Sequence, residues 1–180
     1  MSKIALQGNV SGTGTISLVA PNTSTDRTLT LPDAAGTLDR LERAGNVLQV
    51  VSASTATNTS TSSTTYVAVT NLTASITPSS ATNKVLVFVN MNFYVQSVGA
   101  EGAITIYRNG SDLTGGNGFA DVYTGSSDII AQAPMLYLDS PATTSSTTYA
   151  VYMKRTQGAN TIQTNLRGTT STITLMEIAA

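Results

Sequence analysis

The chain has 180 residues, of which 41% are hydrophobic and 11% are charged, and its formal net charge is −1. This balance argues against disorder, because enough apolar surface is available to offset chain entropy, and the scattered basic residues form no cluster that would bind phosphates. The absence of cysteine and histidine excludes disulfides, Ser–His and Cys–His catalysis and histidine-containing metal sites.

Residues 1–46 are predicted to form a β-rich N-terminal extension. Residues 13–19 and 27–32 alternate apolar and polar side chains, which is typical of half-buried strands. Residues 37–44 permit about two helical turns before Gly45, which supplies a stop. These elements are too short to form a core of their own, so their apolar side chains need another surface to pack on.

Residues 47–180 are predicted to form strand after strand, separated by turn signals. Thr, Val, Ile and Tyr, which suit a pleated and half-buried backbone, are abundant in them. Asn109-Gly110 is the strongest short hairpin signal. The predicted strands are residues 47–53, 66–70, 84–95, 103–107, 129–138, 149–155, 161–166 and 171–178. Eight strands in this length predict an antiparallel sandwich or jelly roll, so the fold class is all-β.

The hexapeptide Thr-Ser-Ser-Thr-Thr-Tyr occurs twice, ending at Tyr66 and at Tyr149, each time where an apolar strand begins. A duplicated half of the domain would explain this repeat, and so would two equivalent strand entries in a background rich in Ser and Thr. The flanking residues align poorly, which favours the second explanation.

The final predicted strand, residues 171–178, carries apolar residues on both of its faces. A strand that is buried on both sides lies in the centre of a sheet or at a subunit interface. Because few residues are charged, little repulsion opposes the close packing of identical faces. We therefore expect this strand to contact a second copy of the chain, through Ile173, Leu175, Met176 and Ile178.

Acidic side chains near a glycine-rich stretch, residues 114–119, are the remaining candidates for chemistry. Asp112, Asp121 and Asp128 could gather around calcium or act as a glycosidase pair. Their spacing matches no EF-hand or nonapeptide calcium motif, which favours exposed loop carboxylates. The sequence therefore assigns no catalytic, cofactor-binding or metal-binding residue, and the protein is predicted not to be an enzyme.

The aromatic residues give little sign of a ligand site, and the chain has no tryptophan. Phe88 and Phe93 lie in a predicted strand and are expected in the core. Phe119 and Tyr123 lie in a predicted loop region, where they could contact a ligand or pack at the rim of the core. Packing is the favoured interpretation.

Two parts of the sequence resemble known families. Residues 28–37, Thr-Leu-Thr-Leu-Pro-Asp-Ala-Ala-Gly-Thr, preceded by Gly-Thr-Ile-Ser-Leu at 14–18, resemble a segment frequent in fibre and surface proteins of tailed phages, cyanophages among them. The strand at 84–95, the Asn109-Gly110 hairpin and the strand at 171–178 are similar to trimeric C1q/TNF-like jelly rolls. Together these resemblances imply a non-enzymatic homotrimer displayed on a virion.

The resemblance leaves two locations open. A capsid decoration or cement protein is favoured, because an extension of 46 residues gives little shaft; a short tail fibre or receptor-binding appendage is the alternative. In both cases residues 1–46 would anchor the protein to the virion and residues 47–180 would form the jelly roll. The anchoring side chains would be Ile4, Leu6, Ile16, Leu18, Leu29 and Leu31.

The partners expected from these inferences are two further copies of the chain and a major capsid protein or a tail or baseplate protein of the same phage. A host surface glycan is a further candidate. We expect no cofactor, no nucleic acid and no insertion into a membrane, because no apolar run approaches the ~18–20 residues that span a bilayer. The first residues lack the apolar core of a signal peptide, so synthesis in the host cytoplasm and a final place on the virion surface are expected.

Overall fold

The computed structural model describes residues 11–15, 17, 19, 22, 24–26, 28 and 43–180. The chain divides into two units after Leu38, and the second unit is described from Arg43 onward. The strands predicted at 13–19 and 27–32 and the helix predicted at 37–44 lie wholly or partly outside the described residues. All six predicted anchoring side chains also lie outside them: Ile4, Leu6, Ile16, Leu18, Leu29 and Leu31.

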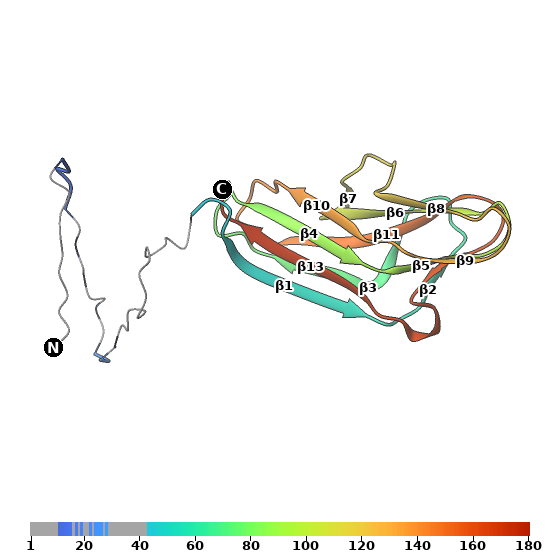
Figure 1. Ribbon diagram of the computed structural model, residues 1–180, viewed down its shortest axis with the longest axis horizontal. Coiled ribbons are helices and arrows are strands. Elements are labelled where there is room, and N and C mark those ends of the chain that lie inside the picture. The colour runs from blue at the N-terminus through green and yellow to red at the C-terminus, as the bar shows by residue number, and fades with distance from the viewer. Residues whose placement is uncertain are drawn as a thin grey trace. The chain divides into compact units, whose positions relative to one another are not determined.

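The described part of the second unit is almost entirely antiparallel β-structure, and it contains no α-helix (Figure 1). Its strands are β1 Val47–Thr55, β2 Thr59–Thr61, β3 Val67–Ile76, β4 Lys84–Asn90, β5 Asn92–Val95, β6 Glu101–Arg108, β7 Ser111–Asp112, β8 Ala120–Tyr123, β9 Ile129–Gln132, β10 Met135–Asp139, β11 Thr147–Gln157, β12 Ile162–Thr164 and β13 Ser171–Ile178. A short 3-10 helix, η1 Leu166–Gly168, precedes β13.

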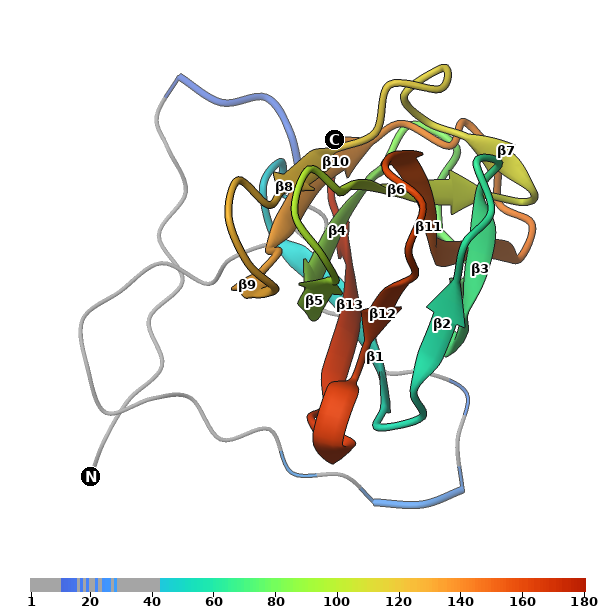
Figure 2. The same ribbon diagram turned by 90° about the vertical axis from the view of Figure 1, so that its right-hand side faces the viewer.

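The strands form two layers in the jelly-roll arrangement. The first layer has the order β1-β13-β4-β10 and continues as β2-β12-β5-β9, so each long strand is interrupted once (Figures 1 and 2). The second layer has the order β3-β11-β6, with β7 and β8 both paired to the free edge of β6. Five pairs of strands are each counted once: β1 with β2, β4 with β5, β7 with β8, β9 with β10, and β12 with β13. This gives eight strands in the orders 1-8-3-6 and 2-7-4-5, which confirms the predicted fold class.

Two of the strands predicted as continuous are each divided into two strands in the structure. The predicted strand at 84–95 breaks at Met91, and the one at 129–138 breaks at Ala133-Pro134. The two breaks lie side by side, because the amide N–H of Ala133 donates to the carbonyl oxygen of Met91 at 2.8 Å. Proline cannot donate to a strand ladder, so the ladder changes from one half-sheet to the other at this point.

A group of buried polar side chains lines the interruption of the first layer. The amide N–H of Asn165 donates to Asn92 Oδ1 at 2.8 Å, and the hydroxyl of Ser171 donates to Asn165 Oδ1 at 2.5 Å. Asn165 also donates to the carbonyl oxygen of Thr57 at 2.9 Å. These hydrogen bonds satisfy backbone and side-chain groups that would otherwise be buried without partners. The interruption of the first layer can therefore lie inside the protein.

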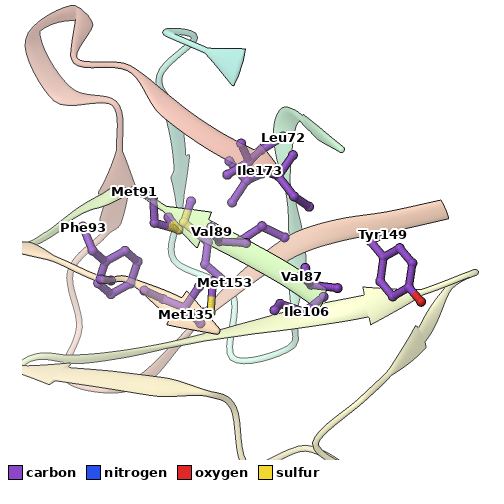
Figure 3. Close-up of a cluster of buried hydrophobic side chains, with 14 of the residues drawn as sticks. Leu72, Val87, Val89, Met91, Phe93, Ile106, Met135, Tyr149, Met153 and Ile173 are labelled. Carbon is purple, nitrogen blue, oxygen red and sulfur yellow. The ribbon is translucent and has the colours of Figure 1, made fainter. Parts of the chain in front are cut away.

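The hydrophobic core lies between the two layers. Figure 3 shows side chains from both layers pointing toward one another, with Phe93 near one end and Tyr149 near the other. The hydroxyl of Tyr149 donates to Asp139 at 2.6 Å, and Arg108 forms an ion pair with the same carboxylate at 2.9 Å. The core is therefore closed at this end by a hydrogen-bonded ion pair rather than by an apolar side chain.

Several local predictions are confirmed. The predicted strand 171–178 matches β13, and the Asn109-Gly110 turn joins β6 to β7 with both residues at positive φ, 48° and 83°. A two-residue hairpin with two positive φ angles is the turn that Asn-Gly favours. The strands β2, β7 and β8 were not predicted, because runs of two to four residues are too short for an alternation of side chains to be recognised.

Candidate assembly surface

The outer face of β1, β13, β4 and β10 gathers several of the large hydrophobic side chains that are exposed among the described residues. On β4 the side chains of Val85, Val87 and Val89 are fully buried between the layers. Because side chains alternate along a strand, Leu86 and Phe88 point outward. The strand is thus apolar on both faces.

The register of the four strands places the outward side chains in rows. One row runs Val50, Met176, Leu86 and Leu138 across β1, β13, β4 and β10. The next row runs Ser52, Thr174, Phe88 and Leu136. Directly opposed side chains in adjacent strands lie roughly 4.5–5.5 Å apart at Cβ, so the apolar members form one continuous patch. We call Val50, Leu86, Phe88, Leu136, Leu138 and Met176 the apolar face.

The apolar face is exposed to an extent that is unusual for large hydrophobic side chains. Leu136 is 64% exposed, Val50 57%, Leu138 47% and Phe88 40%. Lys84 is the only charged residue that these four fully described strands point outward, and it lies at one end of β4. A contiguous apolar patch of this kind on a folded protein typically marks an interaction site.

The structure changes two expectations about this region. Phe88 was expected in the core with Phe93, and this is wrong for Phe88, because it lies on the outward side of β4, whereas Phe93 is fully buried. On β13, Ile173 and Leu175 are fully buried in the core of the single chain, so they have no surface left for a partner. Met176 and Ile178 lie on the outward side, so they alone of the four predicted interface residues can contact a partner, and their contact with a second copy stays a prediction.

Sequence reasoning missed the remaining members of the apolar face. The signal was present, because Lys84–Asn90 and Met135–Asp139 each carry apolar residues at consecutive positions, as the final strand does. The alternation rule explains one apolar face per strand and gives no reason for a second.

A buried carboxylate lies at the end of the first layer where the chain enters it. Glu177 accepts hydrogen bonds from Gln49 at 2.6 Å, from Asn83 at 2.7 Å, and from the amide and hydroxyl of Ser79 at 2.7 and 2.8 Å. Burial raises the pKa of this carboxyl, but the four hydrogen bonds favour its charged form more strongly and lower the pKa to about 2. The carboxylate therefore joins β1, β13 and the β3–β4 connection.

The chain enters and leaves this unit at the same end. Gly45 donates its amide to the carbonyl oxygen of Ala179 at 2.9 Å, and Ala179 donates to the carbonyl oxygen of Asn46 at 2.9 Å. Figure 1 shows the C-terminus at this end, and the connections from β5 to β6 and from β8 to β9 at the opposite end. The end that bears the preceding chain is therefore distinct from the end that bears these loops.

The three acidic candidates have separate surroundings. Asp112 accepts bonds from Thr105, Thr114 and Gly116 and thereby fixes its own turn, and Asp128 accepts bonds from Tyr94 at 2.5 Å and Ser97 at 2.8 Å. Asp121 is on β8, next to β6. Within the described residues, no group of three or more histidine, cysteine, aspartate or glutamate side chains is placed to hold a metal ion.

The two aromatic residues of the predicted loop region have different surroundings. Phe119 packs against the core and meets Tyr137 edge-on, with ring centroids 5.1 Å apart, which confirms the packing interpretation for this residue. Tyr123 lies on β8 and is 55% exposed.

Similarity to known proteins is found among solved structures. No protein-family model and no curated protein matches the chain. Among solved structures, the chain is similar to a mutant VP2 protein of Infectious Bursal Disease Virus in derived T=1 particles, with 14% identity and a TM-score of 0.38. The match covers 83% of this chain and 39% of the other, so this chain spans about two fifths of the length of that protein. Similarity at this level carries no information about function.

The described residues contain no helix that is long and apolar enough to cross a bilayer.

Proposed function

We propose that the protein is a non-enzymatic structural subunit on the outside of a tailed-phage virion, most simply a capsid decoration or cement protein, and that it assembles as a homotrimer. The apolar face is the observation that supports assembly into a homotrimer. Burial of apolar area contributes roughly 25 cal/mol per Å², so the six side chains of this face favour a contact that removes them from water. The phage setting is supported by the resemblance of residues 28–37.

The occupant of the apolar face is a second copy of the chain in this proposal. Val50, Leu86 and Leu138 carry no charge and few hydrogen-bonding groups surround them, so the face has nothing to select a charged partner. Three such faces that converge on a threefold axis are neutral and do not repel one another, and charge is depleted at the core of stable interfaces. In this proposal β13 takes part in the contact between copies through Met176 and Ile178, and the sequence analysis expected the same strand at the interface.

Light scattering on the purified protein tests the assembly. We expect a mass of three times the 18.6 kDa of the chain. Leu136→Asp places an unpaired charge within the apolar face and should give a monomer, since a desolvated charge without a partner costs several kcal/mol. Val98→Asp is the matched control, because Val98 is 66% exposed in the β5–β6 connection, away from the apolar face. A monomeric wild type, or a Leu136→Asp variant that stays trimeric, would contradict the proposal.

The anchor is proposed to lie in residues 1–46. A protein that lacks these residues should remain a soluble trimer and lose its binding to particles that lack the protein. Co-sedimentation of the intact and shortened proteins with such particles measures this. Equal binding would place the anchor in the jelly roll.

The location on the particle is tested by imaging virions that carry the labelled protein. A coated head supports the decoration protein. Label confined to the tail or its tip supports the short tail fibre or receptor-binding appendage instead. Label on neither structure would contradict the virion proposal as a whole.

A further inference from the structure

Three tyrosines gather on the outer face of the second layer, away from the core and away from the apolar face. Tyr107 on β6 and Tyr152 on β11 stack with ring centroids 3.9 Å apart and planes 20° from parallel. Tyr66, in the connection that leads into β3, meets Tyr107 edge-on at 6.0 Å. The rest of this face is mostly hydroxyl and methyl groups, as at Ala68, Thr73 and Ser75. We call Tyr66, Tyr107 and Tyr152 the tyrosine platform.

Polar groups with spare hydrogen-bonding capacity surround the platform. The hydroxyl of Tyr66 is buried and has no hydrogen-bond partner, the only such buried side-chain atom among the described residues. The ammonium group of Lys154 lies 4.4 Å from the centre of the Tyr66 ring. Asp121 on β8 and Lys154 on β11 both pair with Ala103, from opposite sides of β6, so a carboxylate and an ammonium flank the same row.

A glycine-rich loop forms one wall of the platform and is held in place. Asp112 accepts a hydrogen bond from the amide of Gly116 at 2.7 Å, and Lys154 donates to the carbonyl oxygen of Gly116 at 2.9 Å. A Cβ at Gly118 would lie 2.8 Å from the hydroxyl oxygen of Tyr66 and 3.1 Å from the carbonyl oxygen of Ile104, and the residue has a φ of +82°, so glycine suits the place where the loop covers this hydroxyl. The loop and the rings therefore form a preorganised surface.

We propose that the tyrosine platform binds a neutral carbohydrate. Aromatic faces and edges pack against the C–H groups of a sugar ring, and its hydroxyls can bond to the Asp121 carboxylate and the Lys154 ammonium. Asp112 and Asp121 beside a single lysine disfavour a phosphate or another anion. The proposal does not depend on the trimer, because the platform and the apolar face belong to different layers.

Calorimetric titration with maltohexaose, cellohexaose and chitohexaose as probes tests the proposal on the full-length protein. We expect measurable binding of at least one of them. Tyr152→Ala should weaken it by at least about tenfold, because the variant loses an aromatic ring against which the sugar packs. Lys154→Met removes the ammonium group that lies over the Tyr66 ring and should weaken binding several-fold. Tyr123→Ala is the control, since Tyr123 is exposed on β8 outside the platform, and should leave the affinity unchanged.

Two results would overturn the proposal. One is the absence of binding to all three probes at millimolar concentration. The other is binding that survives both Tyr152→Ala and Lys154→Met, which would place the sugar elsewhere. Light scattering on the same samples keeps the outcome separate from that of the assembly proposal, because the platform variants should retain the mass of the wild type.

Discussion

The two layers of the sandwich have similar inner faces and opposite outer faces. Inside, both layers contribute Val, Ile, Leu and Met side chains to one core. Outside, the first layer presents the apolar face, and the second presents hydroxyl groups and the tyrosine platform. The core requires only that one side of each strand be apolar, so the other side is free to take the chemistry that its surroundings favour. The difference in polarity between the two outer faces therefore indicates that they have different surroundings.

The largest loss of stability is expected from a mutation on the inner side of β13, and a mutation on its outward side provides the comparison. Leu175→Asp would bury an unpaired charge in the core and should cost several kcal/mol, enough to give insoluble or unfolded protein. Met176→Asp, one residue later on the outward side, should leave the single chain folded and lower its assembly. Circular dichroism and light scattering measure the two outcomes. A folded, trimeric Leu175→Asp protein would show that the inner side of β13 is misplaced.

Acid should weaken the first layer through Glu177. The folded pKa, about 2, lies below the ordinary value of 4.5, so its contribution is fully present above about pH 4.5 and is lost as the pH falls toward 2. The loss should reach roughly 3 kcal/mol. Urea unfolding between pH 7 and 2 measures it, with Glu177→Gln as control, because that variant should be less stable at pH 7 and approach the wild type in acid. A constant difference between the two proteins would exclude this role.

A smaller loss is expected at Gly102, where the inner face of the second layer meets the first. A Cβ at this position would lie 2.8 Å from two ring carbons of Phe93 and 2.9 Å from Ile162. Because Phe93 is fully buried and cannot move away, Gly102→Ala should cost about 1–3 kcal/mol. Gly125→Ala, whose Cβ would meet only Tyr123 at 4.0 Å, is the matched control in thermal unfolding. Equal melting temperatures for the two variants would contradict the packing described.

The smallest effect is expected on the outer face of the second layer. Ser75 on β3 is exposed and shares a 2.7 Å hydrogen bond with Thr148 on β11. Ser75→Asp should change stability by less than about 1 kcal/mol and leave the oligomeric mass unchanged, since water already solvates this site. A loss of assembly comparable to that of Leu136→Asp would show that both outer faces are interfaces, and the comparison between them would no longer hold.

Local patterns in the sequence were sufficient for the fold class, for the Asn109-Gly110 hairpin and for the bounds of the last strand. Alternation of side chains and the φ preferences of a two-residue turn are local properties, so a short window contains them. The same reasoning joined β4 to β5 and β9 to β10, because the breaks depend on a bond between Met91 and Ala133, which lie far apart in the chain.

The repeated hexapeptide shows most directly what only the tertiary structure decided. Its two copies are identical in sequence, yet Tyr149 is fully buried with its hydroxyl on Asp139, whereas Tyr66 lies outside the core against Gly118 and Lys154. The sequence determined that both copies precede or begin strands. Which side of a layer each ring faces was decided by neighbours brought together from distant parts of the chain, because burial and hydrogen bonding depend on those neighbours and not on the local pattern.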